Sequence, residues 1–236
     1  MEAESSHKGS MLRISVIIPA LNEESIIFST LEALGPVEPE EVIVVDGGST
    51  DQTREIVACT DATLVSSTCG RAEQMNHGAR LARGDVFLFL HADTRLPPSA
   101  IRDIRSALED PRWVGGRFDV RLEGNHRIFG LIGALINLRS RLTKVATGDQ
   151  AIFVRREIFE EIGGFPNLPL IEDIAFSRSL KKKGKVACLK SQVATSARRW
   201  EREGIWQTVL RMWVLRYLYL TGVSPYRLKR YYGDAR

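Results

Sequence analysis

The sequence predicts an α/β fold built around a mostly parallel central sheet. Short, continuous runs of apolar, β-branched residues alternate with helix-like segments along the first half of the chain. Such runs suit strands that are buried on both faces, and strand–helix alternation is typical of parallel sheets. Hydrophobic residues make up 44% of the 236 residues and charged residues 26%. This composition excludes a disordered chain and a polytopic membrane protein.

The first half of the chain predicts four strands, each followed by a helix. Ser49 and Gln52 have the spacing of a capping box, which predicts that the second helix starts there. The expected strands cover 13–19, 41–46, 62–66 and 86–90, and the expected helices cover 23–34, 50–58, 70–83 and 98–109.

The pattern changes after residue 110. We expect a strand or hairpin at 113–122, a short strand at 151–154, and helices at 128–142 and 172–183. The apolar stretch 205–222 contains two arginines, and each would cost about 2.5–3.5 kcal/mol near a bilayer centre. We therefore expect a helix there that packs on the domain or lies at a membrane surface, and not one that spans a bilayer.

The domain organisation follows from these patterns and from an uneven charge. We expect a flexible extension over 1–11, one domain over 12–203, and a basic, apolar helix and tail over 204–236. Residues 196–236 carry a net charge of +6 and the rest of the chain −2. A nucleic-acid-binding domain is usually basic over a whole face, so nucleic acid is not expected as a partner. The three cysteines lack paired spacing, which favours a reducing, cytoplasmic location. A contact of the basic tail with the inner face of the membrane stays open beside packing of the tail on the domain.

Acidic residues follow three of the predicted strands. Glu23, Asp46 and Asp93 come shortly after the first, second and fourth strands. Ligands of open α/β sheets bind beyond the carboxyl ends of the strands, so these side chains are expected at one edge. Converging carboxylates repel each other unless a cation lies between them. Mg²⁺ or Mn²⁺ together with phosphate oxygens fits that requirement.

The motifs at 15–23, 44–51, 91–93 and 172–173, in this order, resemble those of the family 2 glycosyltransferases with the GT-A fold. The resemblance covers about 13–200. The segments 70–76, 148–150 and 196–200 are similar to those of a small bacterial subgroup that is labelled as a radical-SAM-associated transferase.

The resemblance implies an inverting transferase that moves a sugar from a nucleotide-diphosphate donor, UDP-hexose above others, to an acceptor. It implies a nucleotide-binding half over 12–110 and an acceptor-binding, catalytic half over 111–203. The acceptor is expected to be lipid-like or a small molecule. The oligomeric state does not follow from the residues.

The resemblance also implies a nucleotide site. Asp46 would accept a hydrogen bond from a base N–H, although it also suits a turn before two glycines. Asp51 suits a ribose contact or a helix start equally, and Arg71 would contact the base or remain solvated. The implied nucleotide-binding residues are Pro19, Ala20, Asn22, Glu23, Asp46, Asp51, Arg71, His91 and Ala92.

Asp93 is the implied metal ligand, because it ends the motif at 91–93 that stands where the family has DxD. His91 replaces the first acid of that motif, and a neutral imidazole cannot supply the missing charge. It would instead contact the ribose or a metal-bound water, or simply pack. Without a second acid we expect weak metal binding that the donor diphosphate completes.

Asp173 is the implied general base, because an inverting transferase needs a carboxylate to take the acceptor proton. The alternative is that Asp173 and its neighbour Glu172 only stabilise a helix N-terminus. Gly148, Asp149 and Gln150 are expected to contact donor-sugar or acceptor hydroxyls.

Arg199 and Trp200 resemble the end of the QxxRW motif of processive relatives, but the glutamine is absent. Arg199 would stabilise the leaving diphosphate, and Trp200 would offer a flat face to a sugar or an apolar acceptor. A surface arginine and a core tryptophan are the alternatives.

Two other functions stay open, namely a non-catalytic nucleotide-sugar sensor and a membrane-surface adaptor. A dinucleotide oxidoreductase is disfavoured, because no GxGxxG motif follows the first strand.

Overall fold

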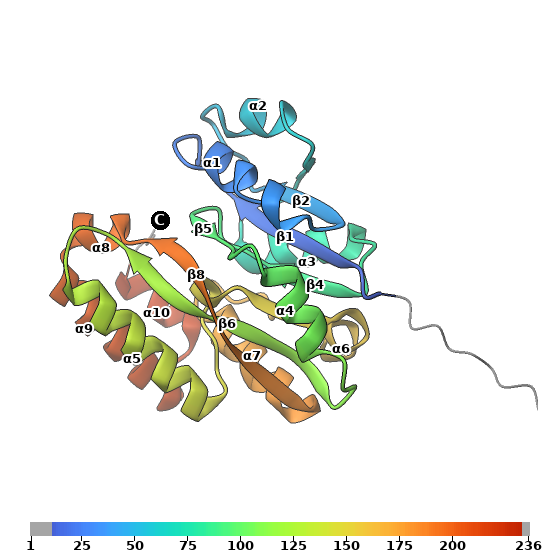
Figure 1. The fold of residues 1–236 in the computed structure, drawn as a ribbon. Coiled ribbons are helices and arrows are strands. Elements are labelled where there is room, and N and C mark those ends of the chain that lie inside the picture. The colour runs from blue at the N-terminus through green and yellow to red at the C-terminus, as the bar shows by residue number, and fades with distance from the viewer. Residues whose placement is uncertain (1–10, 233–236) are drawn as a thin grey trace, which may run out of the picture.

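The computed structural model describes residues 11–232, which form one eight-stranded sheet with helices on both faces (Figure 1). The expected extension over 1–11 lies outside the described residues except for Met11, and 233–236 lie outside them as well. The strands are β1 Ile14–Ala20, β2 Glu41–Asp46, β3 Thr63–Ser66, β4 Val86–Phe89, β5 Thr94–Arg95, β6 Trp113–Glu123, β7 Ile152–Arg155 and β8 Lys185–Ser196.

The sheet is parallel in its first half and mixed in its second. The strand order is β3-β2-β1-β4-β7-β6-β8-β5. β1 pairs in parallel with both β2 and β4, and β2 pairs in parallel with β3, as the sequence predicts. β7 then runs antiparallel between β4 and β6. The strand order reverses at β1, because β2 lies on one side of it and β4 on the other. The carboxyl ends of β1, β2 and β4 therefore open onto a crevice of the kind in which ligands of such sheets bind.

Two hydrophobic cores hold the helices to the two faces of the sheet. One core contains apolar side chains of α1, α2, α4 and α5, and the other contains those of α3, α6 and α7. Phenylalanines dominate the second core, where Phe165 stacks on Phe176 with ring centroids 4.3 Å apart. The helices are α1 Ile27–Glu32, α2 Thr53–Ala58, α3 Arg71–Leu81, α4 Ala100–Ala107, α5 Ile128–Thr143, α6 Arg156–Ile162, α7 Glu172–Lys183, α8 Arg198–Glu203, α9 Ile205–Leu220 and α10 Pro225–Tyr232, with 3₁₀ turns η1 Gly35–Val37 and η2 Gly148–Gln150.

Several elements differ from those expected. Segment 113–122 is not a hairpin but part of the single strand β6, which bends at two register shifts against β8. The capping box at Ser49 is not formed, because the Ser49 hydroxyl accepts a hydrogen bond from Asn22 N and α2 starts only at Thr53. Asp51 Oδ1 instead accepts the Thr53 N–H, at 3.0 Å.

The C-terminal helices pack on the rest of the molecule. Ile205, Val209 and Met212 of α9 contact the first core, and the Tyr226 hydroxyl of α10 donates to the Asn167 carbonyl. Within residues 11–232, no helix is long and apolar enough to cross a membrane. Figure 1 shows α5, α9 and α10 gathered at the end of the molecule away from α1 and α2.

Candidate functional site

The loops after β1 and β2 are tied together by side-chain hydrogen bonds. Asn22, which has a left-handed φ of 55°, accepts the Thr50 N–H at 2.9 Å and donates its own N–H to Ser49. Asp51 Oδ2 accepts the Glu24 N–H at 3.1 Å. Asn22 and Asp51 therefore hold the two loops together, and their expected contact with a nucleotide stays a prediction.

Asp46 ends β2 with a fully buried carboxylate. The carboxylate accepts the N–H groups of Gly48 and Ser49, each at 3.1 Å, and Oδ2 lies 3.9 Å from Arg54 Nε. Asp46 thus holds the turn that follows it, as the turn interpretation describes. Ala20, at the end of β1, accepts the Gly47 N–H across the same opening, and Pro19 precedes it in the strand.

Two carboxylates come together beyond β1 and β4. Burial raises the pKa of the Glu23 carboxyl, and the nearby charge of Asp93 raises it further, against a lowering by Arg198. Arg198 Nη2 lies 3.6 Å from Glu23 Oε2. The Asp93 carbonyl accepts the Ser196 N–H at 3.1 Å, which fixes the loop to the end of β8.

The negative charge of these two carboxylates suits a divalent cation, but the pair supplies too few ligands to hold one alone. Glu23 and Asp93 supply carboxylate oxygens, which Mg²⁺ and Mn²⁺ prefer. No group of three or more acidic, histidine or cysteine side chains suitable for a metal occurs among the described residues. Phosphate or water oxygens would have to complete the coordination.

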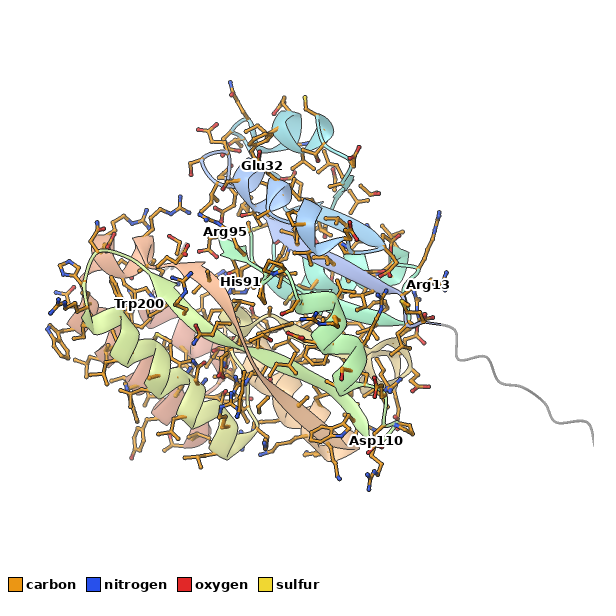
Figure 2. All side chains as sticks on the ribbon, in the orientation of Figure 1. Arg13, Glu32, His91, Arg95, Asp110 and Trp200 are labelled. Carbon is orange, nitrogen blue, oxygen red and sulfur yellow. The ribbon has the colours of Figure 1, made fainter. Side chains whose placement is uncertain are left out.

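His91 follows β4 and lies near the centre of the molecule, between its two halves (Figure 2). Burial, together with the charge of Arg71, lowers the pKa of His91 well below its usual value, so the ring is neutral. Its Nε2 is buried and makes no hydrogen bond to any described residue. Gly148 lies close against the Nε2 side of the ring, where a Cβ would collide with it. The adjacent Ala92 is buried and its carbonyl accepts the Thr30 hydroxyl.

Asp173 lies in the first turn of α7 and faces η2. Its Oδ2 accepts the Gly148 N–H at 2.7 Å. Glu172 is buried and its Oε1 lies 3.8 Å from an Arg71 guanidinium nitrogen. A small cavity brings Arg71, His91, Gly148, Glu172 and Asp173 together. The charge of Arg71 also lowers the pKa of Glu23, so this cavity lies near the acids that follow β1 and β4.

Gln150 is turned into the interior. It is fully buried, its Nε2 donates to Ser140 Oγ of α5 at 3.0 Å, and it completes a capping box with Thr147. Gln150 therefore anchors η2 to α5. Gly148 bonds to Asp173 at the start of η2, and Asp149 follows it.

Two arginines beside Asp149 were missed by sequence reasoning. Burial and the charge of Arg216 together lower the pKa of Arg139 to about 10, while Asp149 and Asp173 oppose the shift. Burial likewise lowers the pKa of Arg216, with the same two acids opposing. Arg139 Nε and Nη2 are buried without a hydrogen bond in the described part of the chain. For Arg216 a signal existed: it continues the inner stripe of α9 formed by 205, 209 and 212.

Arg199 and Trp200 lie in the first turn of α8 and differ in exposure. The Arg199 side chain is 44% exposed, and its Nε donates to Glu203 at 3.2 Å. Partial burial and neighbouring arginines, Arg71 among them, lower the pKa of Arg199, while Asp93 raises it. Trp200 is 9% exposed and belongs to the first core, so little of its ring is available to a sugar (Figure 2).

The pKa of Asp149 predicts a pH-dependent effect on stability. Burial raises this pKa above the ordinary 3.8, with a further rise from Asp173, while a Thr147 hydrogen bond and the charges of Arg139 and Arg216 lower it. The folded state therefore binds a proton more tightly than the unfolded state, so stability falls as pH rises above the ordinary value.

Asp149→Asn, which cannot ionise, is expected to raise the melting temperature at pH 7 by about 2–4 °C for each 1 kcal/mol gained. The gain should vanish below pH 3.8, where Asp149 is protonated in both states. Thermal unfolding from pH 3 to 8 measures it, with the exposed Asp61→Asn as control. A variant less stable than the wild type at pH 7 contradicts the expectation.

The fold and these clusters define an α/β domain of the GT-A type, with acidic and basic groups converging at the carboxyl edge of the sheet. Residues 15–163 match the family described as Glycosyl transferase family 2, and the chain belongs to that family.

Among curated relatives, the O-antigen chain rhamnosyltransferase RfbN of Salmonella typhimurium is 28% identical over 212 residues, covering 78% of this chain and 67% of that protein. S. aureus TarS 1–349 in complex with UDP-GlcNAc superposes with a TM-score of 0.59 at 21% identity, covering 78% of this chain and 58% of that one.

The mannosyltransferase PcManGT from Pyrobaculum calidifontis, in complex with GDP-Man and Mn²⁺, also gives a TM-score of 0.59, at 24% identity, with coverages of 79% and 57%. The chain thus spans a little over half the length of these two solved structures. Likeness at such identities establishes the fold.

Proposed function

We propose that this protein transfers a sugar from a nucleotide-diphosphate donor to an acceptor hydroxyl with inversion at the anomeric carbon. The observation that carries the proposal is the position of Asp173, whose carboxylate accepts the Gly148 N–H in the small cavity that Arg71 and His91 also line. Family membership supports the reaction class, and the UDP-GlcNAc and GDP-Man bound to the similar structures support the donor class.

In the proposed reaction Asp173 accepts the proton of the acceptor hydroxyl. A bond forms between that oxygen and the anomeric carbon, and the bond from this carbon to the diphosphate oxygen breaks on the opposite face. Arg199 would stabilise the negative charge that develops on the leaving diphosphate. Asp149, Arg139 and Arg216 would position the acceptor beside Asp173.

Asp93, with Glu23 beside it, would hold Mg²⁺ or Mn²⁺, which supplies positive charge to the diphosphate when it is bound. Arg198 supplies permanent positive charge at the same place through its ion pair with Glu23. We propose a UDP-hexose as the donor and a cytoplasmic location for the reaction.

A panel of nucleotide sugars with Mn²⁺ tests the donor. A donor that binds the folded state is expected to raise the melting temperature, since ligand at 100 times its Kd stabilises by about 2.7 kcal/mol. The bound donor is then assayed for hydrolysis and for transfer. Failure of every nucleotide sugar to bind contradicts the proposal. Binding without turnover would support the sensor, which the neutral His91 keeps open.

A further inference from the structure

Helix α9 has an unpartnered apolar face. Five large side chains on it recur at alternating steps of four and three residues, which places them on one side of an α-helix. These are Trp206, Leu210, Trp213, Tyr217 and Leu220, and their exposed fractions are 73%, 66%, 71%, 67% and 66%. The opposite side of the same helix packs on the core, so this face points away from the molecule.

Helix α5 has a second face of the same kind. Its leucines at 131, 135, 138 and 142 follow the same spacing and are 60%, 55%, 54% and 76% exposed. The two helices are neighbours, because the charge of Arg216 on α9 lowers the pKa of Arg139 on α5. Figure 1 shows both helices at the same end of the molecule.

The exposed apolar groups are concentrated here and are not spread over the surface. Of thirteen large hydrophobic side chains that the described part of the chain exposes, nine belong to α5 and α9. Single exposed apolar residues are ordinary, but nine of them on two neighbouring helices mark a surface that binds something.

Charge and residue type identify what this face binds. Neither α5, α9 nor α10 contains an aspartate or glutamate, whereas Arg127, Lys144 and Arg227 are exposed on or beside them. Tryptophan and tyrosine favour the boundary between headgroups and acyl chains. The 16 residues of α9 span about 24 Å, less than the roughly 30 Å of a hydrocarbon core. Such a helix lies in the plane of a bilayer surface.

We propose that α5 and α9 together form a docking face for an anionic lipid bilayer. The nine apolar side chains enter the headgroup region, and the surrounding cationic side chains meet the lipid phosphates. This proposal does not depend on sugar transfer, because it concerns the outer side of the two helices.

The test is flotation of the full-length protein with vesicles of phosphatidylcholine and phosphatidylglycerol. The wild type is expected to float with these vesicles and to release at high salt in part, since salt screens the charge contribution. Trp206→Gln combined with Trp213→Gln is expected to weaken vesicle binding about tenfold or more, because it removes two large interfacial groups. The matched control is Phe28→Gln with Leu81→Gln, which removes exposed apolar groups elsewhere and should leave binding unchanged.

Tryptophan fluorescence provides a second readout. Trp206 and Trp213 are the strongly exposed members of the four tryptophans, since Trp200 is buried and Trp113 half-buried. Brominated acyl chains should therefore quench the wild type and not the double variant.

Three outcomes overturn the proposal: no flotation of folded wild type, unchanged flotation of the double variant, or a dimer that the variant dissociates without any vesicle binding, which would assign the face to a second copy. Donor-induced stabilisation, measured on the same samples, reports the nucleotide site separately from the docking face.

Discussion

Asp173→Asn is expected to lower the rate of sugar transfer by about 10²–10⁴-fold, the usual contribution of a positioned general base. Asparagine keeps an oxygen that can accept the Gly148 N–H, so the first turn of α7 and η2 should keep their arrangement. It cannot accept the acceptor proton at neutral pH. The loss should therefore appear in kcat, with donor binding retained.

Single-turnover assays with saturating donor measure this effect. Glu160→Gln is a suitable control, because Glu160 is an exposed acid of α6 whose side chain is 63% exposed. Unchanged transfer by the Asp173 variant would remove Asp173 from the mechanism. Loss of donor-induced stabilisation in that variant would instead assign Asp173 to the donor site.

Asp93→Ala is expected to have the second large effect, namely loss of the metal-dependent part of donor binding. A divalent cation contributes several kcal/mol at a transferring phosphate, and each 1.36 kcal/mol is a factor of about ten in rate. We therefore expect transfer to fall about 10²-fold or more. The fold should survive, since the Asp93 backbone carbonyl, and not its side chain, accepts the Ser196 N–H.

Titration of UDP with and without Mn²⁺ separates the metal effect from general damage. The wild type should bind UDP more tightly with Mn²⁺, and the Asp93 variant should bind it equally with and without the metal. Removing the metal from the wild type with a chelator should reproduce the variant. Asp61→Ala, an exposed acid, is the matched control. A variant that keeps its full response to Mn²⁺ contradicts the assignment.

The centre of the parallel half of the sheet could be predicted from the sequence, because β1, β2 and β4 are short and mostly buried. β2 and β4 are continuous apolar runs, and their positions decide where the acids that follow them lie. β8 could not be predicted in this way. Its burial alternates, and it includes Lys190 and Gln192, so no apolar run marks it.

The candidate site could be predicted as far as it depends on strand ends. Glu23 and Asp93 lie close together because parallel strands deliver them to the same edge. The apolar stripe of α9 indicates that Arg216 faces inward, but no local pattern places α5 and α9 beside η2, so the approach of Arg139 and Arg216 to Asp149 needed the structure. Trp200 is the opposite case. Its residue type suggests a face for a sugar or an apolar acceptor, but its side chain packs in the first core.

The attachment of η2 at both ends has a consequence for which parts of the site can move. Gln150 bonds it to Ser140 of α5, and Gly148 bonds it to Asp173 of α7. Two helices and the turn between them therefore form one rigid block, and the proposed base belongs to it. Adjustment to an arriving donor must then come from the opposite wall, where the loops after β1 and β2 are held by exposed side-chain hydrogen bonds. In the proposed mechanism the acceptor side of the site would then be preorganised and the nucleotide side adaptable.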